Sequence, residues 1–440
     1  MSVGAKATEL RAQEAAASYL VELPAQAVCP KGYKQTEVGV MPEDWKCKSL
    51  ASMSAFITKG STPTTYGHKW EQSGILFLRS ECVSENGLDL TQSMFISHAA
   101  HAALRRSEVR DGDILVTITG NVGRVVYLQN IGCANLNQHI ARVRISSDQV
   151  ERRYIYHYLS QTSVRRHFNS ITTGQAYPQI SLKQVREAVI PLPPTKAEQE
   201  AIAGALSDAD ALIESLEQLI AKKRQLKQGA MQELLTGKKR LPGFSEEWEV
   251  KRLGQLAKIQ RGASPRPIDS PIWFNENSSV GWVRISDVTS SGMYLKETTQ
   301  RLSHMGIQNS RPVSRGSLIM SICATVGRPI ITEIDVCIHD GFVVFDSLGA
   351  NKYFIYYVLK FIEGDWYRHG QTGSQMNLNT GLINETEVQL PPTEKEQSAI
   401  GAILSNIDTE IAALEARLAK ARDVKQGMMQ ELLTGKTRLK

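Results

Sequence analysis

Residues 227–238 read KQGAMQELLTGK and residues 425–436 read KQGMMQELLTGK, so the two stretches differ at one position. A second pair, PPTKAEQEAIAGALSDAD at 193–210 and PPTEKEQSAIGAILSNID at 391–408, lies at the same offset of 198 residues. Two long matches at one offset indicate an internal duplication. The chain therefore contains the same structural unit twice.

The near-identical segments are predicted to be long helices. A Thr-x-x-Glu capping box follows a Pro-Pro pair at 195–198 and again at 393–396, which is typical of a helix start. Gly237 and Gly435 follow Leu-Leu-Thr and suit the residue just beyond a helix end. Each helix then spans about 40 residues, or roughly 60 Å.

Apolar residues recur in steps of four and three along both predicted helices, which is the pattern of a coiled coil. The seam residues are Ile202, Leu206, Ile213, Leu216 and Ile220 in the first copy, and Ile400, Leu404, Ile407, Ile411, Leu414 and Leu418 in the second. We expect the two copies to pair antiparallel about an approximate two-fold axis; packing of each helix on its own neighbouring domain is the alternative. Gly229 and Gly427 lie inside the predicted helices. Close approach of another helix is one explanation for their presence there.

The regions outside the helices match more weakly but in the same order. DGDILVTITGNVGR at 111–124 corresponds to RGSLIMSICATVGR at 315–328, and KGSTP at 59–63 to RGASP at 261–265. Alternating and apolar runs predict strands at 75–79, 114–119, 125–128 and 140–145, and at 282–285, 318–322, 330–332 and 342–345, with helices near 152–168 and 351–368. Two bodies that diverged on one scaffold suggest two different ligands.

The predicted fold is a mixed α/β (α+β) one, with two similar globular domains separated by two long helices in an antiparallel coiled coil. Its expected parts are an N-terminal helical segment 1–41, a body 42–192, a helical segment 193–239, a body 240–390 and a helical segment 391–440.

Composition narrows the function classes. A net charge of +6 and a pI near 8.9 favour a polyanionic partner only mildly. The six cysteines form no CxxC pair, so we expect buried, reduced thiols and neither a metal site nor a disulfide framework. Residues 1–20 lack a signal-peptide core and no run reaches 18 apolar residues, which predicts a cytoplasmic protein without a membrane span.

Several motifs together resemble the specificity subunits of type I restriction-modification systems. They are the Leu-Pro-Pro-x-x-x-Glu-Gln helix starts at 192–202 and 390–400, the KQG-x-MQELLTGK-x-RL endings, KQTEVGVMPEDW at 34–45, and the loops TTGQAYPQIS at 172–181 and QTGSQMNLNT at 371–380. The resemblance covers residues 30–440. It implies that each body is a target recognition domain for one half of a bipartite double-stranded DNA site. It also implies helices that act as a spacer and dock two methyltransferase subunits, to which restriction (translocase) subunits add.

The sequence contains none of the common catalytic motifs. The Pro-Pro pairs at 193–194 and 391–392 lack the Asn/Asp and Tyr/Phe of an adenine methyltransferase box, and no Walker A loop, GxSxG or HExxH occurs. We therefore expect a non-catalytic subunit with no cofactor. The alternatives are a single-chain modification enzyme with an unrecognised motif, a stand-alone DNA-binding or anti-restriction protein, and a coiled-coil scaffold with carbohydrate- or protein-binding heads.

Candidate DNA contacts are of two kinds, because positions shared by both bodies suit phosphate contact or framework pairing, while base readers should differ between them. The shared candidates are Lys59, Arg79 and Arg124 in the first body and Arg261, Arg284 and Arg328 in the second. The differing candidates are Gln175, Tyr177 and Gln179 against Ser374, Gln375 and Asn377, with Arg105 and Arg106 in the first body only.

Overall fold

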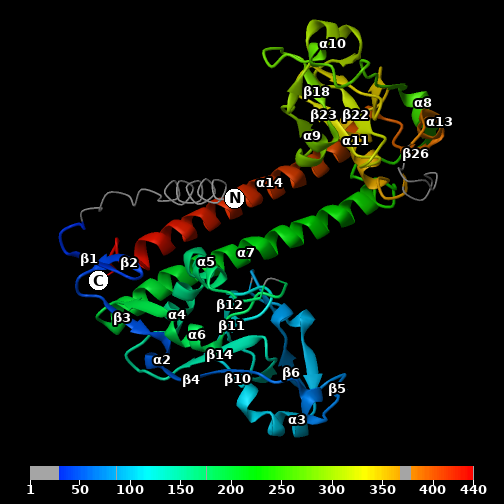
Figure 1. Cartoon of the computed structure of the whole chain (residues 1–440). Helices are drawn as coiled ribbons and strands as arrows, with labels where there is room; N and C mark the ends of the chain where they lie inside the picture. Colours follow the sequence, from blue (N-terminus) through cyan, green and yellow to red (C-terminus); the bar gives the residue numbers. More distant parts are fainter. Residues whose placement is uncertain (1–28, 86, 175, 367–377, 440) are drawn as a thin grey trace, which may run out of the picture. The chain divides into compact units, whose positions relative to one another are not determined.

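The computed structural model describes residues 29–85, 87–174, 176–366 and 378–439. The predicted helical segment at the N-terminus therefore lies largely outside the described residues. The chain divides into two compact units, Met1–Glu214 with Ala419–Lys440, and Ser215–Leu418. Each unit contains one body and part of both long helices (Figure 1).

The two long helices, α7 (Lys196–Leu234) and α14 (Glu394–Leu432), have 39 residues each, as the repeat predicts. The Thr195 hydroxyl accepts the Glu198 amide at 3.2 Å, which satisfies one of the free N–H groups at the start of α7. Gly237 and Gly435 end the helical stretches with φ of +67° and +70°, a left-handed conformation that glycine adopts without strain.

The two helices run antiparallel in each unit, as predicted. In the second unit, Arg224 pairs with Glu415 at 2.6 Å and Lys227 with Asp408 at 2.6 Å. The residue numbers of the partners on α14 therefore decrease as those on α7 increase. In the first unit, Lys425 pairs with Asp210. The eleven seam residues are buried or half-buried; they are Ile202, Leu206, Ile213, Leu216, Ile220, Ile400, Leu404, Ile407, Ile411, Leu414 and Leu418.

The ends of both helices also enter the cores of the bodies. Ile202 and Leu433 join the core of the first unit, and Met231 and Ile400 join the core of the second. At their ends the helices therefore pack on the bodies, as the alternative predicts, and they also pair with each other. A Cβ added at Gly229 or Gly427 would meet nothing within 4 Å. Close approach of a helix within this chain is thus the wrong explanation for these glycines.

The first body contains two main sheets, with strand orders β10-β13-β6-β9-β5 and β12-β11-β14-β4, and a two-stranded pair of β7 (Val83–Ser84) and β8 (Gly87–Leu88). The strands of the first sheet are β5 (Trp70–Glu71), β6 (Ile75–Leu78), β9 (Met94–Ile96), β10 (Glu108–Arg110) and β13 (Cys133–Leu136). Those of the second are β4 (Ser54–Lys59), β11 (Ile114–Thr117), β12 (Val125–Tyr127) and β14 (Ile140–Ile145). Its helices are α2 (Leu50–Met53), α3 (His98–Ala103), α4 (Arg152–Leu159), α5 (Thr162–Ser170) and α6 (Leu182–Glu187).

The second body repeats this arrangement, with sheets β17-β25-β22-β23-β19 and β20-β18-β24-β21. The first holds β17 (Lys258–Arg261), β19 (Tyr294–Leu295), β22 (Leu318–Ser321), β23 (Pro329–Thr332) and β25 (Phe342–Asp346). The second holds β18 (Gly281–Val283), β20 (Gln300–Arg301), β21 (Arg311–Val313) and β24 (Val336–Ile338). The helices are α8 (Leu253–Leu256), α9 (Ile285–Ser290), α10 (His304–Gln308), α11 (Lys352–Phe361) and α13 (Thr380–Glu385).

Two-stranded ribbons join each body to its long helix. The ribbons are β3 (Lys46–Ser49) with β15 (Val189–Leu192), and β16 (Glu249–Arg252) with β26 (Glu387–Leu390). A hairpin of β1 (Tyr33–Thr36) and β2 (Gly39–Pro42) precedes the first body. The same joining element therefore serves both copies.

The eight predicted strands are present, with ends that shift by one or two residues. The predicted helix 152–168 is wrong as a single element, because α4 ends before Ser160, whose hydroxyl bonds the Tyr156 carbonyl at 2.7 Å, and α5 follows. The predicted helix 351–368 is too long, because α11 ends at Phe361.

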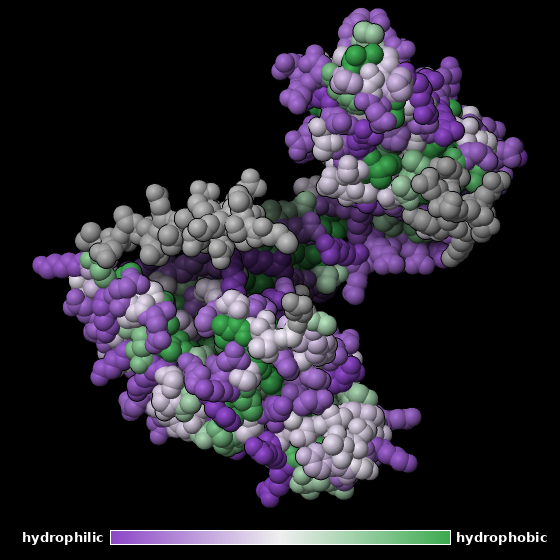
Figure 2. Space-filling model, in the orientation of Figure 1, coloured by the Kyte–Doolittle hydropathy of each residue, from purple (hydrophilic) through white to green (hydrophobic). Residues whose placement is uncertain are grey.

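All six cysteines are free, as predicted. Cys82 and Cys337 are buried, but Cys133, the first residue of β13, is exposed, so the prediction of buried thiols is wrong there. In the described part of the chain, no helix combines the length and the apolar composition needed to cross a bilayer. On the side shown in Figure 2, apolar side chains form small separate patches among hydrophilic ones on each body.

Candidate nucleic-acid interface

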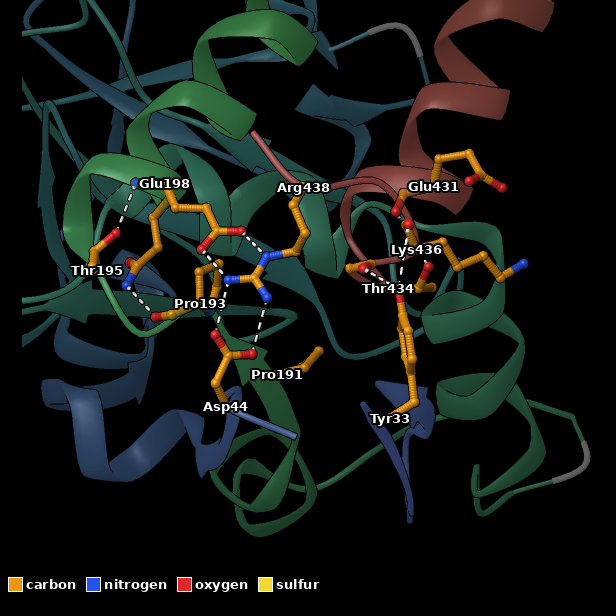
Figure 3. A network of polar contacts seen from close by, with 12 residues as sticks. Tyr33, Asp44, Pro191, Pro193, Thr195, Glu198, Glu431, Thr434, Lys436 and Arg438 are labelled. Atoms are coloured by element: carbon orange, nitrogen blue, oxygen red, sulfur yellow. Dashed lines mark hydrogen bonds and ion pairs between the residues drawn. The ribbon is translucent and has the colours of Figure 1, made fainter. Parts of the chain in front are cut away.

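An arginine at the end of each long helix binds a glutamate at the start of the other. In the first unit, Arg438 binds both oxygens of Glu198 and also Asp44, at 2.9 and 3.0 Å (Figure 3). Its guanidinium lies 5.7 Å from the ring centre of Trp45. Glu198 is 4% exposed, so this charge-assisted, two-pronged contact is shielded from water. We name these residues the first junction.

The second unit repeats the contact with the same residue types. Arg240 donates from Nε and Nη2 to the two oxygens of Glu396, both at 2.8 Å, and lies 5.8 Å from the ring centre of Trp248. Glu396 is 1% exposed. This second junction explains why helix starts and helix ends are nearly identical in the two copies, because each start must fit the end of the other helix.

The glutamine beside each junction glutamate ties the body to the long helix. Gln199 accepts the Glu151 amide at 2.9 Å and donates to the Pro193 carbonyl at 3.3 Å. Gln397 does the same for Asn351 and Pro391, at 2.8 Å in both bonds. The Glu-Gln pair of the motif therefore fixes the orientation of each body on its helix.

Four loops of the first body meet at one place, and their described residues are 59–63, 117–124, 136–140, and 172–174 with 176–180. The Gly60 amide donates to the Asn137 carbonyl at 3.1 Å, and the Gly120 amide to the Pro178 carbonyl at 2.9 Å. We call this cluster of loops the first edge. It brings Lys59, Tyr177 and Gln179, three of the predicted DNA contacts, into one group of loops.

Glycine is required where the first turn meets the third loop. A Cβ on Gly60 would lie 1.7 Å from the Leu136 carbonyl oxygen, and one on Gly262 would lie 2.1 Å from that of His339. The Lys-Gly and Arg-Gly turns thus hold the exposed Lys59 and Arg261 at equivalent positions of the two bodies.

Polar and aromatic side chains form a connected row along the first edge. The Thr62 hydroxyl donates to Gln138 Oε1, and Gln138 Nε2 lies 3.2 Å from His139 Nε2. Because an amide nitrogen can only donate, His139 Nε2 accepts and Nδ1 carries the proton. The His139 ring meets Tyr177 edge-on at 6.3 Å, and Tyr177 is 61% exposed. The row offers amide, imidazole and aromatic groups for hydrogen bonding and stacking.

The equivalent loops of the second body, which we call the second edge, keep the backbone frame of the first edge but present different side chains. The Ser264 hydroxyl donates to Asp340 Oδ1 at 2.8 Å, as Thr62 does to Gln138. Arg266 reaches the same carboxylate at 3.6 Å. Burial raises the pKa of Asp340, but the Ser264 hydrogen bond and the charges of His339 and Arg261 outweigh it and leave the pKa below its ordinary value. Asp340 is therefore an ionised, acceptor-only group where the first edge has an amide.

The predicted residues of the loop before each long helix are only partly described. Tyr177 and Gln179 are exposed on the first edge. The remaining ones, Gln175, Ser374, Gln375 and Asn377, lie outside the described residues.

The recurring arginines are bonded within the bodies. Arg124 Nη1 donates to the Val83 carbonyl at 3.5 Å, and Arg328 Nη2 to the Ser291 carbonyl at 3.2 Å. Arg284 bonds the Gln300 side chain at 2.7 Å. These contacts favour framework pairing over phosphate contact for these three. Arg79 is partly exposed and paired with Glu81 at 3.1 Å.

Arg105 and Arg106 line a basic pocket of about 280 Å³ with Phe56, Thr58, Glu108, Arg142 and Arg144. Arg144 is paired with Asp113 at 2.6 Å, whereas Arg142 lies under the Phe56 ring at 4.5 Å. Burial, followed by the charge of Arg144, lowers the pKa of Arg142 to about 10. It still carries its charge at neutral pH, so the pocket suits an anion such as a phosphate.

Sequence reasoning missed Gln138, His139 and Asp340, and also Arg142. An alignment of the two copies could have found Gln138, His139 and Asp340, since NQHI at 137–140 faces HDGF at 339–342, but it would not have found Arg142. That signal identifies residues that differ between the bodies. It does not show that Thr62 and Ser264 hold them, which depends on the fold.

Comparison with known proteins agrees with this arrangement. A family model described as type I restriction modification DNA specificity domain matches residues 42–224 and 245–421. The putative type I restriction enzyme MjaX specificity subunit of Methanocaldococcus jannaschii is 25% identical over 432 residues, or 93% of this chain and 97% of the relative. The MjaVIII specificity subunit of the same organism is 25% identical over 425 residues, or 91% and 94%.

Solved structures show the same fold. A type I restriction-modification S subunit from M. genitalium matches with a TM-score of 0.60 and 16% identity, over 88% of this chain and 96% of that chain. A chain from a structure on complex assembly and conformational transition of the type I R-M system matches with a TM-score of 0.54 and 17% identity, over 90% and 99%. Because the family model matches both copies, this chain belongs to the type I restriction modification DNA specificity family.

Proposed function

We propose that each edge reads one half of a split double-stranded DNA site, and that the two halves differ in sequence. The observation that carries this proposal is the paired edges, which share a backbone frame but present Gln138 and His139 in one body and Asp340 in the other. A glutamine amide suits adenine and a carboxylate suits the amino group of cytosine. Lys59, Arg261 and the pocket beside Arg105 supply phosphate contacts.

We propose domain bounds of 42–192 and 240–390 for the two recognition domains, with 193–239 and 391–440 as spacer helices. The junctions support these bounds, because they fall where each body meets a long helix. The spacer helices set the separation of the half-sites, and the chain itself performs no catalysis.

We propose that the exposed faces of the long helices dock two copies of a methyltransferase subunit. Gln228, Gly229 and Gln232 are exposed on α7, and the same residue types recur exposed on α14. Identical exposed residues in two copies suit two identical partners. A glycine with open space above it lets a partner approach the helix backbone closely.

Methylation mapping tests the proposed function. The chain is co-expressed with a methyltransferase subunit of its own system, and N6-methyladenine is mapped across the host genome. We expect one split motif with two unlike halves. A continuous motif would contradict the proposal. Methyl transfer by the purified chain alone would favour the single-chain enzyme.

A further inference from the structure

Three side chains of the first body bring different ligand atoms together outside the edge. They are His101 on α3, Glu108 at the start of β10 and Cys133 at the start of β13, and their ligand atoms all lie within 4.8 Å of one another. Strand pairing places Glu108 beside Asn135, two residues along from Cys133 and on the same side of the sheet. The helix then lays His101 over that face.

The neighbouring amide fixes which nitrogen of His101 is free. Asn135 is fully buried, and its Nδ2 donates to the Leu104 carbonyl and to the Ser107 hydroxyl, both at 3.0 Å. Its Oδ1 therefore faces His101 Nδ1 at 2.5 Å as an acceptor. The proton must lie on Nδ1, and Nε2 keeps its lone pair. Histidines that bind metal ions are commonly oriented in this way by a partner on the other ring nitrogen.

The unprotonated nitrogen of His101 faces the Cys133 thiol, which can donate to it, at a distance that also fits a shared metal ion. His101 Nε2 and Cys133 Sγ are 3.6 Å apart. With zinc bonds of about 2.0–2.1 Å to nitrogen and about 2.3 Å to sulfur, a tetrahedral angle separates the two atoms by about 3.6 Å. Glu108 is half-buried and Cys133 is exposed, so the carboxylate can rotate into place and an ion can enter from solvent.

We propose that His101, Glu108 and Cys133 form a binding site for one divalent ion of the zinc class, with water as the fourth ligand. Thiolate and imidazole together favour zinc-like ions over magnesium or calcium, which prefer oxygen ligands. Burial and the charge of Glu108 raise the pKa of the Cys133 thiol, so binding releases the thiol proton to solvent. The charge of nearby Arg144 is offset by its pairing with Asp113.

The sequence could not predict this site, because its ligands are spread over α3, β10 and β13 and form no close-spaced pair. The turn at 104–107, which carries Arg105 and Arg106, lies between two of the ligands. The ion would therefore hold that turn against the sheet. The use of the turn in DNA binding rests on the proposed function, whereas ion binding does not.

The second body provides an internal comparison. Pro312 pairs with Cys337 as Glu108 pairs with Asn135, so a proline stands in the place of the carboxylate. Ile307 lies four residues after the capping serine of α10, as His101 does in α3. The second body thus lacks two of the three ligands, and we expect one ion per chain.

The experiment uses the purified, tag-free full chain, stripped with chelator and titrated with Co²⁺ and Zn²⁺. We expect about one ion per chain after desalting, a thiolate-to-cobalt charge-transfer band, and a higher melting temperature with zinc. Cys133→Ser and His101→Ala should each weaken ion binding by at least about tenfold and abolish the charge-transfer band or the shift in melting temperature. Mg²⁺ should have no effect. Cys323→Ser in the second body is the matched control and should retain both signals.

Three results would overturn the proposal: no cobalt–thiolate band in the full chain, equal binding by Cys133→Ser, or loss of the band in Cys323→Ser. Cys133 is exposed, so its serine variant should melt like the parent chain in chelator, which separates lost binding from lost folding. A separate titration with DNA, with and without zinc, tests whether the ion affects DNA binding through the turn at 104–107. If zinc binds as expected but DNA binding fails altogether, the proposed function is wrong and the ion site stands.

Discussion

The two junctions and the two edges of this chain occupy equivalent places in the duplicated unit, yet they have diverged to very different extents. Arg438 with Glu198 and Arg240 with Glu396 are the same contact made twice. The edges share their backbone frame, a basic residue and a hydroxyl donor, whereas the group that accepts from this hydroxyl is Gln138 in one edge and Asp340 in the other.

The difference follows from what each region must fit. Each junction joins the start of one copy to the end of the other, so a change in either copy must match its partner. An edge is held by contacts within its own body, such as Thr62 with Gln138 and Ser264 with Asp340, so it can change without a matching change in the other copy. Divergence at the edges and identity at the junctions therefore separate the residues that hold the scaffold from those that meet a ligand.

The largest effect is expected at the second junction. Glu396→Gln removes the carboxylate that two Arg240 nitrogens bind, at a site where the glutamate is 1% exposed, and we expect the largest loss in the free energy of unfolding among these variants. Glu198→Gln should cost less, because Arg438 keeps its bonds to Asp44. Chemical denaturation measures both, and the exposed Glu233→Gln is the control. Equal losses at the two junctions would show that Asp44 contributes nothing.

Substitutions on the edges should alter the sequence preference of one half-site. Gln138→Ala should relax one base in the first half-site, and Asp340→Ala one base in the second, each by about 1–3 kcal/mol of discrimination. Methylation mapping and binding to single-base variants of the site measure this. Gln92→Ala, an exposed glutamine of the same body, is the control. A change in both half-sites from one substitution would break the assignment of one edge to one half.

The units should also differ in acid sensitivity. Burial, followed by the charge of Lys425, lowers the pKa of His157 to about 3, below the ordinary value of about 6.5. The unfolded chain therefore takes up a proton below pH 6.5 that the folded chain resists, and stability falls as the pH drops from 6.5 toward 3. The loss is about 2 kcal/mol by pH 5.

His157→Gln should remove this pH dependence, which denaturation at pH 7.5 and pH 5 measures. In the second unit Tyr357 bonds Asp408 at 2.7 Å in place of a histidine, so Tyr357→Phe is the control and should lower stability equally at both pH values. An unchanged slope in His157→Gln would assign the acid sensitivity to other groups.

The smallest effect is expected at the helix glycines. Gly229→Ala and Gly427→Ala each replace a poor helix former in open space, and we expect the free energy of unfolding to rise by up to about 1 kcal/mol each. The double variant should nevertheless assemble less well with the methyltransferase subunit, as measured by co-purification. Stabilisation with unchanged assembly would remove these glycines from the proposed docking faces.

The repeat and the periodic apolar residues were sufficient to predict both long helices, their antiparallel pairing and the paired bodies. These features depend on local pattern and on similarity within the chain. The break at Ser160 was missed because the apolar pattern continues across it, whereas the helix stops where the Gln161 amide turns to the Tyr158 carbonyl three residues back and the Ser160 hydroxyl adds a bond to the Tyr156 carbonyl.

The candidate site was predictable only in outline. The Lys-Gly and Arg-Gly turns and the loop residue Tyr177 could be found from the alignment of the two copies. The roles of Glu198 and Gln199 beyond the helix cap could not be predicted, because their partners Arg438 and Glu151 are distant in sequence. The internal bonds of Arg124 and Arg328 were equally hidden, since recurrence alone cannot separate a framework arginine from a phosphate contact.

The most direct test of the central claim, one scaffold carrying two independent readers, is to give both copies the same body. In this variant residues 245–390 are replaced by residues 42–192, which start at the equivalent position and leave Arg240 and Glu396 in place, and N6-methyladenine is mapped after co-expression with the methyltransferase subunit. Because the two copies run antiparallel, we predict a motif with two identical, inverted halves, each equal to the first half-site, at the original spacing. A folded variant that still methylates the original second half-site would contradict the account.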